Sequence, residues 1–145
     1  AVPEEVVDAA EYGEEAVVLA WLDDGGRINV TLECLYSDGP VSGMTLLILA
    51  MTYGREGLAE ALLQRGADLS LQNSNGGTAL TRAAAYGFEK LVELALRHGA
   101  VLDQRSEFGS TALILAADRG HKQTVDSLIR HGAEIDLQDK NGDTA

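Results

Sequence analysis

Residues 76–84 read Gly-Gly-Thr-Ala-Leu-Thr-Arg-Ala-Ala, and this stretch decides the fold because the chain repeats it. The same pattern, a glycine and a threonine followed by small or aliphatic residues, occupies 43–50 and 109–117, and its opening Gly-x-Thr recurs at 142–144. The four threonines, Thr45, Thr78, Thr111 and Thr144, stand 33 residues apart. A fixed period of this length is typical of a stacked repeat protein, in which each unit buries its apolar face against its neighbours.

Two sets of glycines keep the same step and predict two short helices in each unit. The first helix begins after the threonine, whose hydroxyl can cap exposed backbone N–H groups. The second helix carries apolar residues at three- and four-residue spacing, as in 91–96. Glycines at the turn between the helices and after the second helix suit a left-handed backbone, and they are Gly54, Gly87 and Gly120, and Gly66, Gly99 and Gly132. The loop residues Leu69, Leu102 and Ile135 are expected to lie beneath the following unit.

This pattern resembles the ankyrin repeat, a unit of about 33 residues with Gly-x-Thr-Pro-Leu-His-x-Ala-Ala near its start and an end such as Gly66-Ala67-Asp68. The resemblance covers residues 43–145 and implies an all-α ankyrin-repeat solenoid of stacked helix-turn-helix units joined by extended hairpin-like loops. The chain departs from the family at two positions. The proline of the family is Leu46, Ala79 or Ala112 here, and its histidine is Ile48, Thr81 or Ile114. The side-chain hydrogen bonding of that histidine is therefore expected to be absent throughout.

The spacing divides residues 1–145 into repeats of a single domain. A divergent repeat 1 covers about 4–36, with a longer loop to about 42, and is followed by repeat 2 (about 43–75), repeat 3 (about 76–108) and repeat 4 (about 109–141). Residues 142–145 match the start of a fifth repeat, so we expect the chain to be a fragment of a longer protein. The long segment 30–42 has two interpretations that the sequence leaves open, a functional loop tip or a tolerated surface insertion.

The charge of the chain is concentrated at its N-terminal end. The net charge is -12, and residues 1–40 hold ten acids against one base, Arg27, which gives -9. This end is either a solvated cap or a docking surface for a basic partner. Nucleic acid is not an expected ligand, because binding it needs clustered Lys and Arg. We expect no membrane insertion and no signal peptide, and a monomer in the cytoplasm or nucleus.

No residue pattern indicates catalysis, a metal site or a cofactor, so we expect a protein that is not an enzyme. Cys34 is the only cysteine, which excludes an internal disulfide and a cysteine-based zinc cluster. His98 and His131 each precede a helix-ending glycine, where a histidine interacts favourably with the last carbonyls of a helix. His121 follows Gly120, where the family commonly has histidine.

The resemblance implies a binding groove made of loop tips and the exposed ends of the first helices. Tyr12, Tyr53 and Tyr86 occupy equivalent positions before the turn glycines, and Arg119 completes this row. Tyrosine and arginine often dominate binding energy, although each tyrosine could instead pack on the neighbouring repeat. Arg82 departs from its equivalents Leu49 and Leu115, and it either pairs with an acid or reaches a ligand. The candidate partner-binding residues are Tyr12, Met44, Tyr53, Ser74, Asn75, Tyr86, Glu107, Phe108, Ser110, Asp118 and Arg119.

The expected function is a non-catalytic protein–protein interaction module that binds a protein or peptide partner in this groove. A second hypothesis is a regulatory or autoinhibitory domain that packs against a catalytic domain of the same larger polypeptide.

Overall fold

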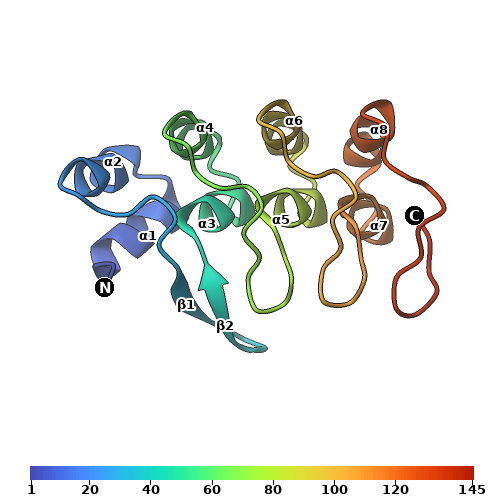
Figure 1. Cartoon of the computed structure of the whole chain (residues 1–145), viewed down its shortest axis with the longest axis horizontal. Coiled ribbons are helices and arrows are strands. Elements are labelled where there is room, and N and C mark those ends of the chain that lie inside the picture. Colours follow the sequence, from blue (N-terminus) through green and yellow to red (C-terminus); the bar gives the residue numbers. More distant parts are fainter.

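The computed structural model describes residues 1–145 and shows pairs of helices stacked side by side along one axis (Figure 1). The helices are α1 (Glu4–Tyr12), α2 (Glu15–Asp23), α3 (Leu46–Thr52), α4 (Glu56–Gln64), α5 (Ala79–Ala85), α6 (Glu89–Arg97), α7 (Ala112–Asp118) and α8 (Lys122–Arg130). The strands are β1 (Leu32–Tyr36) and β2 (Gly39–Met44). The predicted helical solenoid is confirmed.

The helices form two layers, and the connecting loops leave the stack on one side. The first helices of the pairs make the inner row, next to the loops, and the second helices make the outer row above it (Figure 1). The loops descend below the inner row. Along the inner row α3 packs against α5, and α5 packs against α7. Ala83 and Ala84 of α5 are fully buried at these contacts, since small side chains let neighbouring helices approach closely.

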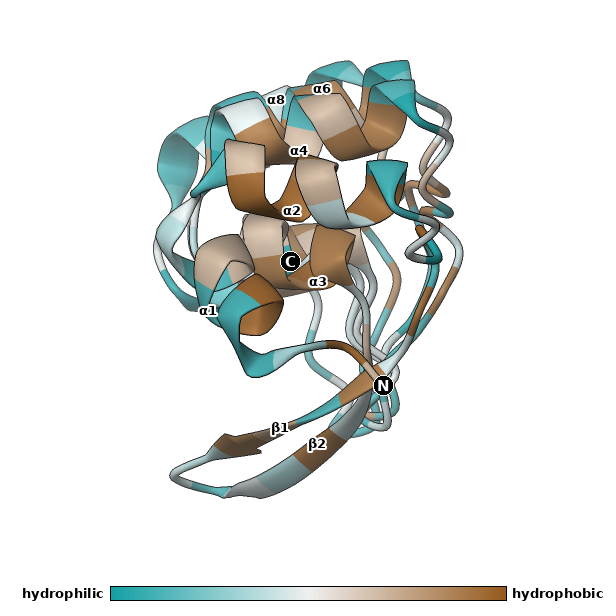
Figure 2. Ribbon diagram, turned by 90° about the vertical axis from the view of Figure 1, so that its left-hand side faces the viewer, coloured by the Kyte–Doolittle hydropathy of each residue, from teal (hydrophilic) through white to brown (hydrophobic).

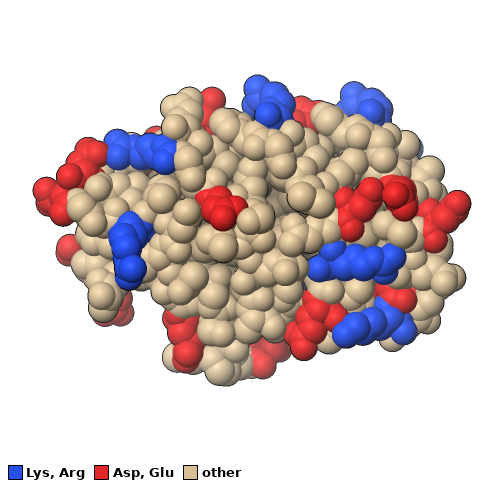
Figure 3. All heavy atoms as spheres, in the orientation of Figure 1, with Lys and Arg blue, Asp and Glu red and all other residues tan.

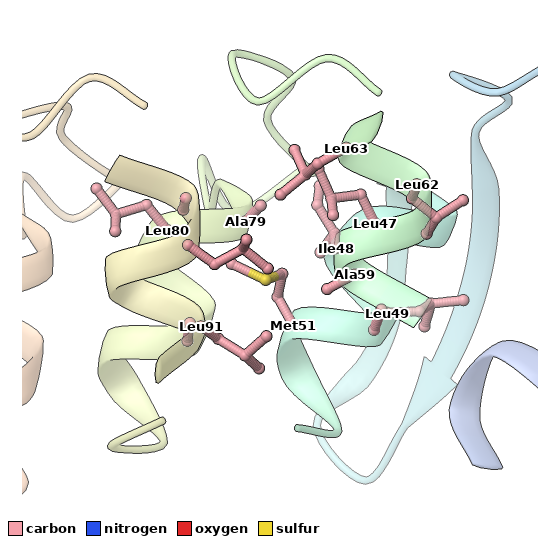
Figure 4. Close-up of a cluster of buried hydrophobic side chains, with 14 of the residues drawn as sticks. Leu47, Ile48, Leu49, Met51, Ala59, Leu62, Leu63, Ala79, Leu80 and Leu91 are labelled. Carbon is pink, nitrogen blue, oxygen red and sulfur yellow. The ribbon is translucent and has the colours of Figure 1, made fainter. Parts of the chain in front are cut away.

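The core lies between the two layers and runs through neighbouring repeats. Leu47, Leu62, Leu80 and Leu91 are almost fully buried there (Figure 4). Leu47 and Leu62 come from one helix pair, and Leu80 and Leu91 come from the next. Because each pair buries its apolar side chains against the next, the core is continuous along the array.

The threonines cap the first helices as predicted. The Thr45, Thr78 and Thr111 hydroxyls accept hydrogen bonds from backbone N–H groups three residues later, at 3.1, 3.2 and 3.3 Å. In α5 the Thr81 hydroxyl also accepts from the Thr78 N–H at 2.8 Å, which completes a capping box. The expectation that the position of the family's histidine provides no side-chain hydrogen bond is therefore wrong for Thr81, because its short hydroxyl reaches back to the cap.

The glycines after both helices adopt the predicted left-handed backbone, with φ between 72° and 92°. In addition, the residue that follows each turn glycine reaches back over the preceding repeat. Arg55 Nε donates to the Glu11 carbonyl at 2.6 Å, and His121 Nε2 lies 2.9 Å from the Ala85 carbonyl oxygen. Phe88, at the same position, packs over Gly54. These contacts tie successive turns together.

The long segment after α2 folds into an antiparallel hairpin, which the sequence interpretation did not include. β1 pairs with β2 with Leu32 opposite Met44 and Tyr36 opposite Gly39. The hairpin projects away from the stack beneath the first helices (Figure 2). The alternation of Leu32, Cys34 and Tyr36 before a Ser-Asp-Gly turn is the sequence signal that could have identified it.

The predicted burial of the aliphatic loop residues Leu69, Leu102 and Ile135 holds for two of the three. Leu69 and Leu102 are partly buried and pack against the core. Ile135 is 52% exposed, so the prediction is wrong there. The physical reason is that no helix pair of the described chain packs beyond α7 and α8.

Candidate functional site

The loop tips are joined to one another by backbone hydrogen bonds. The Ser74 N–H donates to the Ser42 carbonyl at 2.8 Å, Glu107 to Asn75 at 2.9 Å, and Lys140 to Phe108 at 3.0 Å. We call these bonds the loop-tip ladder. It joins the hairpin and the three following tips into one surface and restricts their independent movement.

Two side chains at equivalent positions strengthen the ladder. Gln72 Nε2 donates to the Arg105 carbonyl at 3.1 Å, and Arg105 Nη1 donates to the Gln138 carbonyl. Gln72 and Arg105 also bond within their own loops, to Gly76 and Gly109. Each of these two side chains therefore holds both its own turn and the next one.

Tyr86 and Arg119 of the predicted row meet in the structure, together with Arg82. The Arg82 and Arg119 guanidinium carbons lie 5.3 and 5.5 Å from the centre of the Tyr86 ring. Both distances are within the range of a cation–π interaction. The Tyr86 ring also stacks on Phe88, with 6.2 Å between ring centres. The result is a cluster of two cations and two aromatic rings that joins the third and fourth helix pairs.

The other two tyrosines of the row differ in environment. Tyr12 is 70% exposed at the end of α1, so a partner can reach it. Tyr53 is partly buried beside Tyr36 of the hairpin, and burial raises the pKa of Tyr53, with a further contribution from Glu11. Tyr53 thus packs against a neighbouring element, as the alternative interpretation of the row describes.

Two of the candidate residues are inaccessible. Met44 is fully buried, and its sulfur accepts from Asn73 Nδ2 at 3.4 Å. Ser110 is 7% exposed at the base of its loop. Both stand just before a helix-capping threonine, where the chain has already returned to the core, so the prediction that they contact a partner is wrong. The remaining loop and helix-end candidates are exposed: Ser74, Asn75, Glu107, Phe108 and Asp118.

A hollow of about 290 Å³ lies between the hairpin and the cluster around Tyr86. One wall is formed by the hairpin around Tyr36, Asp38 and Val41. The opposite wall is formed by Arg82, Tyr86 and Arg119. Arg82 was not among the predicted site residues. Its departure from the leucines at positions 49 and 115 was the available sequence signal, but the place of its side chain depended on the hairpin and on Arg119.

Cys34 and His131, which lie outside this cluster, have surroundings that fit a structural role. Burial raises the pKa of the Cys34 thiol, and Glu11 adds to this effect, which disfavours a reactive thiolate. His131 Nδ1 lies 2.8 Å from the Ser127 carbonyl oxygen, in the predicted contact with a helix end. No group of three or more potential metal-ligating side chains comes together.

The surface charge is mixed on the face that Figure 3 displays, where Lys and Arg side chains lie among Asp and Glu and form no large basic patch. None of the helices is both long and apolar enough to span a membrane.

Comparison with known proteins identifies the repeats. A family model described as ankyrin repeats (3 copies) matches residues 6–106 and 90–145. A comparison with curated proteins finds no match. Ankyrin repeats are generally protein–protein interaction modules and are typically not catalytic. With the stacked helix pairs, the threonine caps and the loop-tip ladder, the match shows that this chain belongs to the ankyrin repeat family.

Proposed function

We propose that the surface formed by the loop tips and the exposed ends of the first helices binds a protein partner. The observation that supports this most directly is the exposure of large aromatic side chains along it. Tyr86 is 42% exposed and Phe108 is 64% exposed. Exposed aromatic residues beside arginine are typical of the energetic centres of protein interfaces.

The rigidity of this surface also favours binding. The loop-tip ladder holds the tips in register, and the contacts of Tyr86 with Arg82 and Arg119 order long side chains before a partner arrives. A surface that is already ordered loses less conformational entropy on association.

The test is affinity capture from cell lysate with the Tyr86→Ala/Phe108→Ala variant beside the wild type. Val101→Ala/Ile129→Ala is the matched control, because Val101 and Ile129 are also exposed apolar residues, at 60% and 41%, but lie outside the row and the tips. The proposal expects a partner that the wild type and the control retain and the Tyr86/Phe108 variant loses. A partner retained equally by all three proteins, with folding checked by circular dichroism, would contradict it.

A further inference from the structure

The hollow beside Tyr86 contains two arginines without acidic partners. The ion pairs of the chain join Arg65 to Asp23 and Arg130 to Glu89 and Glu93. Neither Arg82 nor Arg119 has a carboxylate within ion-pair distance, although the chain carries a net charge of -12. In a chain so rich in acids, two unpaired guanidinium groups at one place form a local site of opposite charge.

The arginines are held in place by contacts that leave many of their N–H groups free. Arg82 Nε donates to Thr52 Oγ1 at 3.2 Å, and its Nη2 donates to the Tyr86 hydroxyl at 3.4 Å. The Arg119 guanidinium lies over the Tyr86 ring and donates no hydrogen bond within the protein. Since a guanidinium carries five N–H donors, most of these donors remain available to a ligand.

The remaining lining of the hollow is neutral except for one residue. Asp38, at the tip of the hairpin, is the only carboxylate among the lining residues. It is exposed, and its nearest hydrogen-bonding partner is the Ser37 hydroxyl at 3.4 Å. Two arginines against one aspartate leave the hollow with a charge of +1, opposite in sign to the whole chain.

We propose that this hollow binds the carboxylate of an aspartate or glutamate side chain in an extended segment of the partner protein. Arginine is suited to this because its planar fork of donors matches the two oxygens of a carboxylate. The Tyr86 ring can contact the aliphatic part of the same side chain, and the hairpin encloses it from the other side. This inference rests on the proposed function, since it names the chemistry that one part of the groove selects.

The experiment is a selection from a random peptide display library on the wild type and on an Arg82→Gln/Arg119→Gln variant. Lys90→Gln/Arg97→Gln on α6 is the matched control, because it removes two positive charges from exposed residues of the outer row. We expect peptides selected on the wild type and on the control to share an acidic residue at one position, and peptides selected on the Arg82/Arg119 variant to lack it.

The dissociation constants of one selected peptide, and of the same peptide with its acidic residue changed to the amide, are then measured on both proteins. Together they give the coupling energy between the peptide carboxylate and the two arginines. The change is expected to weaken binding to the wild type at least about tenfold and to have little effect on the Arg82/Arg119 variant. If that variant does not fold by circular dichroism, Arg119→Gln alone serves, since the Arg119 side chain donates no hydrogen bond within the protein and contacts the Tyr86 ring.

The outcomes separate this inference from the proposed function. A folded wild type that selects no peptides contradicts both. Selected peptides that lack a shared acidic residue, or that are enriched in basic residues attracted by the net negative charge of the chain, are two further results. Either result contradicts the proposed carboxylate site but leaves the proposed binding by the groove intact. The same is true if the amide change weakens binding equally to the wild type and the arginine variant.

Discussion

At the scale of single residues, Gly87 shows how one position serves both its own turn and the next repeat. Its φ of 73° suits glycine, and a Cβ built there would lie 2.5 Å from Nδ1 of His121. His121 in turn contacts the Ala85 carbonyl, so its ring is not free to move away without losing that bond. Gly120 has nearly the same φ, 75°, but a Cβ there would have no neighbour within 4 Å.

We therefore expect Gly87→Ala to destabilise the protein more than Gly120→Ala. Gly120→Ala should lower the free energy of unfolding by about 1–2 kcal/mol through backbone strain alone. Gly87→Ala should add about 1–3 kcal/mol for the steric conflict with His121. Urea unfolding followed by circular dichroism measures both. Equal losses would show that His121 relaxes without cost and that the turn contact contributes little.

At the scale of elements, the hairpin β1–β2 distinguishes this array from a regular one. It is anchored through its inward side chains, because Cys34 is buried and Tyr36 packs against the core. The Tyr36 hydroxyl is buried and has no hydrogen-bond partner in the protein. Burial raises the pKa of Tyr36 above its ordinary value, and the neighbouring Tyr53 and Cys34 raise it further.

Tyr36→Phe should stabilise the protein by about 1 kcal/mol near neutral pH, because it removes a buried hydroxyl that lacks a partner. It should also reduce the loss of stability in alkali. Because the pKa of Tyr36 is higher in the folded state, its ionisation does not affect stability below the unfolded pKa of about 10, and the protein loses stability as the pH rises above that value.

Thermal unfolding from pH 7 to 11 tests this prediction. Tyr12→Phe is the control, because it removes a phenolic hydroxyl from an exposed residue instead of a buried one. A Tyr36→Phe protein that is less stable than the wild type at pH 7 would show that the hydroxyl makes a favourable contact.

At the scale of the whole molecule, each helix pair packs only against its sequence neighbours, so stability should depend on position along the array. Leu62 in α4 and Leu128 in α8 are both fully buried leucines. Leu62 belongs to the second helix pair, which has a neighbouring pair on each side (Figure 1). Leu128 belongs to the final pair of the described chain, which has a neighbour on one side.

Leu62→Ala and Leu128→Ala should each cost about 2–5 kcal/mol locally but unfold different regions. Leu128→Ala should increase hydrogen exchange in α7 and α8 while α3 to α6 stay protected. Leu62→Ala should increase exchange on both sides of α4, since it weakens two interfaces. Hydrogen-exchange mass spectrometry resolves the difference, and a uniform increase across the chain in both variants would mean that the array unfolds as one cooperative unit.

Most of the fold could be predicted from the sequence because its signals act over a few residues. The threonine caps and the left-handed glycines each depend on backbone geometry within one turn, and the 33-residue period places them in register. The exposure of Phe108 could be predicted in the same way, from its place on a loop tip. The resemblance to ankyrin repeats also indicated the side of the stack on which to look for a binding surface.

The tertiary structure alone decided which side chains meet. Tyr53 and Tyr86 occupy equivalent positions, yet the hairpin covers one and two arginines flank the other, because neighbouring repeats supply different partners. Arg82 and Arg119 are 37 residues apart and converge only when α5 and α7 stack. The sequence by itself therefore determined the repeat, its helix boundaries and its family. Packing between repeats determined the buried and accessible candidates and the cationic hollow, because such contacts depend on residues far apart in the chain.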